Sequence, residues 1–140
     1  DTTVQGLVFN NGGSTNPAQM GIYQTNSNRL PSSILSGSVV TTPASISTNS
    51  IIRVDLASQL TLSANTWYWL AICNSSQGNN VSMLTMGTGT PVATNFPETG
   101  TRNRSTLRII AGTINSLPST ITQSDLSQQY LAPMMGVVLN

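Results

Sequence analysis

Residues 60–73 read LTLSANTWYWLAIC and place three aromatic side chains, Trp67, Tyr68 and Trp69, next to one another. The whole chain is only 5% aromatic, so this run is either a binding surface or part of a core. Successive side chains of a β-strand point to opposite faces, so at most the two tryptophans share a side. The three rings therefore cannot form one continuous platform.

Both faces of this expected strand are apolar. One face carries Trp67, Trp69, Ala71 and Cys73, and the other carries Tyr68, Leu70 and Ile72. We therefore expect a central strand that is covered on both sides, with the tryptophan face turned toward the core. Trp69 is favoured as a core residue. For Trp67, at the exposed start of the strand, a core role and sugar stacking are equally open.

Short β-branched or aromatic runs alternate with breaks of Gly, Pro, Asn and Ser along the chain, as in NNGGSTNP at residues 10–17. Such breaks supply turns, and the pattern predicts an all-β protein. The expected strands are residues 3–9, 19–24, 34–42, 50–57, 66–73, 81–86, 105–111 and 134–139. Since 140 residues suit one domain, we expect a single domain over residues 1–140, a jelly-roll-like antiparallel β-sandwich of about eight strands.

Two local patterns refine this fold. In SIIRVDLA, residues 50–57, the side chains of Ile52, Val54 and Leu56 are expected to point inward, and those of Ile51, Arg53 and Asp55 outward. The segment TQSDLSQQYL, residues 122–131, is the best helical candidate, with Ser124 as a cap and Asp125 near the helix N-terminus. One or two turns of helix are expected there.

Charged residues make up only 6% of the chain, and the formal net charge is +1. No electrostatic field would attract nucleic acid, and no apolar run is long enough to span a membrane, so neither partner is expected. A β-sandwich also has edge strands, and this chain has few charges with which to protect them. We therefore expect a subunit of an assembly, a homotrimer or a capsid-bound copy.

All five basic residues are arginines, and three of them, Arg102, Arg104 and Arg108, crowd into TGTRNRSTLR at residues 99–108. Arginine pairs with carboxylates and stacks on rings, so this cluster is a candidate interface anchor. Solvated loop arginines are the plainer and favoured alternative.

Catalytic chemistry has little support. The chain has no histidine, which removes Ser-His-Asp and Cys-His arrangements and the commonest metal ligand. Among its four acids, Asp1, Asp55, Glu98 and Asp125, only Asp55 and Glu98 suggest a glycosidase pair, and nothing fixes their separation. The single cysteine, Cys73, is expected to be a small buried residue. We expect no enzyme, no metal and no cofactor.

Five short apolar motifs follow one another along the chain: MGIY (20–23), RLPSSILSGSVV (29–40), LTLSANTWYWLAI (60–72), SLPSTI (116–121) and LAPMMGVVL (131–139). Over residues 19–139 this pattern resembles a β-sandwich domain of tailed-bacteriophage virion proteins. The chain departs from it at Asn65 and Thr66, where the family turns through glycine, and in a longer loop at residues 87–103. Tyr68 and Trp69 match a Tyr-Trp pair that is structural in the family.

The resemblance implies a non-enzymatic virion protein of the tail-fibre, head-fibre or capsid-decoration type, often trimeric and in contact with other virion subunits. In a fibre, the loop at residues 87–103, with Phe96 and Arg102, would contact a host-surface glycan. The alternative is a secreted carbohydrate-binding module of a microbial enzyme, with Trp67 and Tyr23 as stacking rings. A glycan hydrolase would need Asp55 and Glu98 close together.

Overall fold

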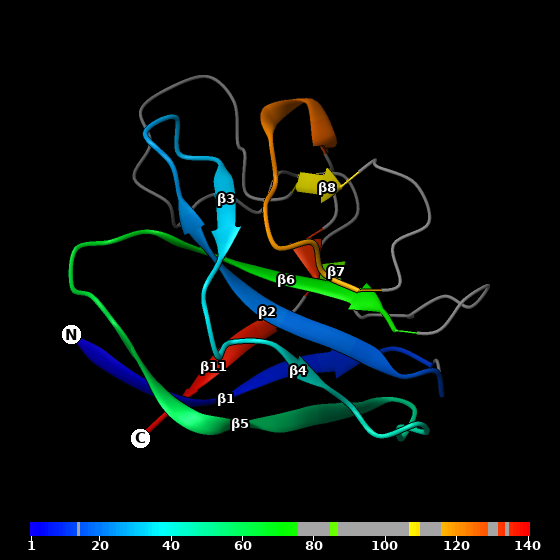
Figure 1. Cartoon of the computed structure of the whole chain (residues 1–140). Coiled ribbons are helices and arrows are strands. Elements are labelled where there is room, and N and C mark those ends of the chain that lie inside the picture. Colours follow the sequence, from blue (N-terminus) through cyan, green and yellow to red (C-terminus); the bar gives the residue numbers. More distant parts are fainter. Residues whose placement is uncertain (14, 76–84, 87–106, 110–115, 129–131, 134) are drawn as a thin grey trace.

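The computed structural model describes residues 1–13, 15–75, 85–86, 107–109, 116–128, 132–133 and 135–140 (Figure 1). This part of the chain consists of β-strands joined by turns, with one short 3-10 helix. No helix in the described ranges is long and apolar enough to cross a membrane. The predicted all-β, antiparallel sandwich is confirmed.

Two antiparallel sheets form the sandwich. The first contains β11 (Met135–Leu139), β1 (Thr2–Asn11) and β5 (Ser50–Leu62), in that order. In the second, β2 (Ala18–Thr25) pairs with β6 (Tyr68–Asn74) along one edge and with β3 (Pro31–Ile34) and β4 (Val40–Thr41) along the other. Two short ladders join β7 (Thr85–Met86) to β10 (Ala132–Pro133) and β8 (Leu107–Ile109) to β9 (Leu126–Gln128).

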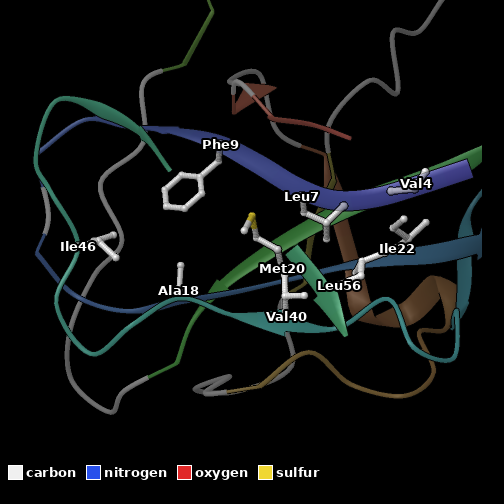
Figure 2. Close-up of a cluster of buried hydrophobic side chains, with 9 residues drawn as sticks. All are labelled: Val4, Leu7, Phe9, Ala18, Met20, Ile22, Val40, Ile46 and Leu56. Atoms are coloured by element: carbon white, nitrogen blue, oxygen red, sulfur yellow. The ribbon is translucent and has the colours of Figure 1, made fainter. Parts of the chain in front are cut away.

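The inner core lies between the two sheets (Figure 2). Its buried members are Val4, Leu7, Phe9, Ala18, Met20, Ile22, Val40, Ile46 and Leu56. β1 and β2 supply six of these nine residues, three from each strand, and in β1 the alternation changes phase at the irregularity between Val4 and Gly6. Complete burial of a side chain such as Phe9 or Met20 contributes about 1.5–3 kcal/mol.

Alternation in β5 is as predicted. Leu56 is buried and Ile52 and Val54 pack against the inner core, while Ile51 is 71% exposed. The exposed Arg53 and Asp55 form an ion pair, with Arg53 Nε 2.7 Å from Asp55 Oδ1. Since the two charges are two residues apart, they share the outer face of the sheet.

The two faces of β6 are both covered, as predicted, and Trp69 packs in an apolar cluster as expected of a core residue, but its face is not the one that meets the first sheet. Tyr68 and its neighbours on the other face pack against the inner core, whereas Trp69, Ala71 and Cys73 pack on the opposite side of the sheet. Among the described residues only β2 pairs with β6, so the expected central position is not observed. Periodicity separates two faces, but it cannot say which of two apolar faces meets the other sheet.

The strand predicted at residues 34–42 is divided into β3 and β4. A turn at Ser36 and Gly37 separates them, and Gly37 has a φ of 79°, which glycine adopts without strain. Ser38 follows, and its hydroxyl accepts a hydrogen bond from Ile22 N and donates one to Ile22 O, at 3.0 and 3.2 Å. β3 and β4 pair with the same edge of β2, and the Ser38 side chain bonds the backbone of Ile22 in the gap between them.

The segment predicted as a helix at residues 122–131 forms one 3-10 turn, η1 (Gln123–Asp125), followed directly by β9. Its cap is Thr122 rather than Ser124, because Asp125 Oδ2 accepts hydrogen bonds from Thr122 N and Oγ1 at 2.8 and 2.6 Å. These bonds lower the pKa of the Asp125 carboxyl. Asp125 therefore stabilises a single turn. The helix does not continue, because the next residues form β9 and pair with β8.

Gly6 marks an irregularity in the first sheet. Val4 pairs with Leu60 but Gly6 pairs with Asp55, so β5 bulges between these positions. A Cβ at Gly6 would lie 2.8 Å from Asp55 Oδ1 and 2.9 Å from the Val54 carbonyl oxygen. Only a residue without a side chain allows this approach.

We predict that Gly6→Ala lowers the free energy of unfolding by about 1–3 kcal/mol, because backbone as well as side-chain atoms must move away. Gly13→Ala is the matched control, since a Cβ there meets nothing within 4 Å. Urea unfolding followed by tryptophan fluorescence measures both variants. Equal stability of the two variants would contradict the close packing at Gly6.

Candidate functional site

A second apolar cluster, the outer cluster, covers the outside of the second sheet. Its members are the buried residues Tyr23, Leu117 and Ile121 and the partly buried Ile34, Trp69, Ala71, Cys73 and Leu126. Residues 116–126 supply the covering layer. Backbone bonds from Ile34 N to Ser119 O and from Ile121 N to Ser32 O, at 2.8 and 2.7 Å, hold this layer along β3.

Tyr23 lies at the centre of the outer cluster and is completely buried. Its hydroxyl donates a hydrogen bond to the carbonyl oxygen of Pro118, and its backbone pairs with Trp69 of β6. The prediction that Tyr23 is a sugar-stacking ring is therefore wrong, because neither face of the ring is accessible. The ring packs in the outer cluster, and its hydroxyl is occupied by the hydrogen bond to Pro118.

Gly21 allows the covering layer to approach β2. A Cβ at this position would lie 2.9 Å from Leu117 Cδ1 and 3.2 Å from Ile34 Cδ1. The side chain of Gln19, on the same face of β2, accepts a hydrogen bond from Leu117 N at 2.6 Å. Segments 20–23 and 116–121 thus form one packed unit, although Tyr23 and Pro118 are 95 positions apart in the sequence.

Trp67 lies just before β6 and is 52% exposed. Its backbone carbonyl accepts a hydrogen bond from Thr25 Oγ1 at 2.6 Å, which fixes the start of β6 beside the end of β2. The preceding loop turns through Asn65, whose φ of 56° is tolerated by Asn nearly as well as by Gly. Asn65 thus forms a turn at one of the two positions where the sequence departs from the phage pattern.

Among the predicted ligand residues, Trp67 is the one with an exposed ring in the described part of the chain. Tyr23 is separated from solvent by the outer cluster, so the two rings do not form a common sugar platform. Phe96, Arg102 and Arg104 lie outside the described residues. Arg108 lies in β8, where the structure describes the backbone and its pairing with Ser127.

Carboxylates and the thiol show no clustering in the described residues. Asp1 accepts a hydrogen bond from Ala64 N, Asp55 pairs with Arg53, and Asp125 accepts a hydrogen bond from the Thr122 backbone at the start of η1. No group of three or more His, Cys, Asp or Glu residues that could hold a metal ion occurs within the described ranges. Glu98 lies outside them, so the Asp55–Glu98 pair stays a prediction.

Burial in the outer cluster disfavours the ionised forms of Cys73 and Tyr23. It raises the pKa of the Cys73 thiol from 9.0 to about 11. Burial, with a smaller contribution from Cys73, raises the pKa of Tyr23 from 10.0 to about 12. Both groups are neutral at physiological pH, so Cys73 acts as a small apolar residue, as expected from the sequence.

One feature of the surface was not identified as a site from the sequence. Alternation in residues 50–57 predicted an outward Ile51 beside an outward Arg53 and Asp55, but not that β5 would be an edge strand of its sheet. The strand order depends on the pairing of β1 with β5 and β11, which no local pattern reveals. An exposed isoleucine beside an ion pair on an edge strand is a candidate contact surface.

We predict that stability is complete below about pH 9 and falls as the pH rises toward 12, because Cys73 and Tyr23 ionise more readily in the unfolded chain. Tyr23→Phe should lower the unfolding free energy at neutral pH by about 1–2 kcal/mol, since Pro118 loses its donor. Above pH 10 the variant should lose stability less steeply than the unchanged chain. Urea unfolding between pH 8 and 11 tests this, and parallel pH profiles would contradict it.

The chain was compared with protein-family models, curated protein sequences and solved structures. None of them matches it.

Proposed function

We propose that this protein is a non-enzymatic structural subunit of a bacteriophage virion, either decorating or cementing the capsid or forming part of a fibre. The observation that carries the proposal is the convergence of three motif segments of the phage pattern. MGIY lies in β2, the Tyr-Trp pair begins β6, and SLPSTI covers them both. Their residues act together as a packing unit, which is what a structural motif requires.

Surface composition supports the same proposal. The chain is 6% charged, so little electrostatic repulsion opposes contact between copies. Among the residues that the structure describes, the large exposed apolar ones are Val39, Ile51, Trp67 and Leu139. In an assembled subunit, such side chains are covered by neighbouring subunits. A virion location and contact with other virion subunits follow from this proposal.

A homotrimer is the expected state of a fibre domain. Light scattering on the purified chain at micromolar concentration should then give a mass of about 44 kDa, three times 14.8 kDa. A monomer that binds to capsids would favour the decorating role. A monomer that binds glycans but no virion component would contradict the proposal and favour the carbohydrate-binding module.

The second candidate, a secreted carbohydrate-binding module, rests on the exposed ring of Trp67. A fibre domain that binds a host-surface glycan would use the same ring. In both cases the exposed indole would stack on a sugar face, as aromatic rings at binding surfaces do. Because Tyr23 is buried, Trp67 would act without it.

We predict that Trp67→Ala abolishes glycan-array binding but changes the unfolding free energy by less than about 1 kcal/mol, as expected of an exposed side chain. Trp69→Ala is the control, because this ring packs in the outer cluster and its loss should cost about 3–5 kcal/mol. Glycan binding that survives Trp67→Ala would remove this ring from the site. Absence of glycan binding by the unchanged chain would leave the capsid role as the proposal.

A further inference from the structure

The outer edge of β5 is the strand edge best suited to pairing with another chain. At 13 residues β5 is the longest strand, and within the described part of the chain β1 is the only strand that pairs with it. Figure 1 shows β5 along the lower border of the molecule. Strand edges present unpaired backbone donors and acceptors that another strand can use.

The side chains on β5 make this edge complementary to itself. Arg53 and Asp55 both point outward, and their side chains are 48% and 65% exposed. Ile51, two residues earlier on the same face, is the most exposed of the large apolar residues in the described chain. One positive charge, one negative charge and one apolar group thus follow one another at a spacing of two residues.

We propose that β5 pairs antiparallel with β5 of a second copy, around a two-fold axis at Val54, so that the two first sheets join into one. The axis runs perpendicular to the joined sheet, which keeps both outer faces on the same side. Each Arg53 then lies opposite Asp55 of the other copy, and each Ile51 opposite Ala57. Residues directly opposite each other in antiparallel strands have their Cβ atoms about 5 Å apart, within reach of an ion pair.

The charges select this register over its neighbours. An axis at Arg53 would place two guanidinium groups opposite each other, and an axis at Asp55 would place two carboxylates opposite each other. Like charges in directly opposed positions are destabilising. With the axis at Val54 both cross-strand pairs are attractive. Arg53 has five donors, so it can bind Asp55 of both copies at once.

Edge strands are commonly protected by charges and bulges, and β5 has both. A run of like charges would repel a second copy, but this pair has opposite signs and its sum is zero. The bulge between Asp55 and Leu60 limits regular pairing to a short stretch. We therefore expect a reversible association, in which the fraction of associated chains rises with protein concentration. It would join free chains into dimers or link larger assemblies, and it does not depend on the proposed virion role.

The test uses charge changes on β5. Arg53→Asp gives an edge with two acids, and Asp55→Arg gives an edge with two bases. Each variant alone should associate at least about tenfold more weakly than the unchanged chain, because like charges now lie opposite each other. An equimolar mixture of the two should associate again, and so should the double variant R53D/D55R. Sedimentation equilibrium over a range of concentrations measures these four samples and the unchanged chain.

Arg29→Asp is the matched control, because it makes the same charge change on an exposed residue away from β5. It should associate like the unchanged chain. Circular dichroism checks that each variant keeps its β-structure. We expect it to do so, because the substituted side chains are exposed. The proposal is overturned if the unchanged chain does not self-associate at any concentration, or if the mixture associates no more strongly than its two components.

Discussion

The structure depends on a single constraint, that β2 is buried on both faces and paired along both edges. Ala18, Met20 and Ile22 point into the inner core, and Gly21 and Tyr23 point into the outer cluster. One edge of β2 is occupied by β6, and the other by β3 and β4. The inner core, the second sheet and the outer cluster are therefore all positioned by contact with this strand. A substitution in β2 disturbs two apolar layers at once.

Local alternation was sufficient to predict the sandwich and the core residues of β5. It failed where two apolar faces had to be distinguished. Tyr23 and Trp69 have the aromatic character of sugar-binding rings, and the segment that buries them, around Pro118, lies far along the chain. No pattern within a short window contains that contact. The interruption at Gly37 is equally non-local, because both halves of the predicted strand pair with one edge of β2.

The candidate site was predicted less well than the fold for the same physical reason. A ring is available to a ligand only if nothing else covers it, and covering segments come from elsewhere in the chain. Trp67 and Trp69 are two residues apart, yet Trp69 packs in the outer cluster while Trp67, just before β6, is half exposed. Stacking and core roles were equally open for Trp67 because no sequence pattern shows where the covering layer ends.

A nearly uncharged surface also determines how such a protein can recognise a partner. Long-range steering is weak with so few charges, so recognition must come from backbone hydrogen bonds, shape and a few well-placed ion pairs. The edge of β5 combines these elements, since its backbone sets the spacing and Arg53 and Asp55 set the register. An ion pair that contributes little to the stability of one exposed chain, about 0–1 kcal/mol, can thus specify which register two chains adopt. Specificity here arises from the order of two charges along a strand rather than from their strength.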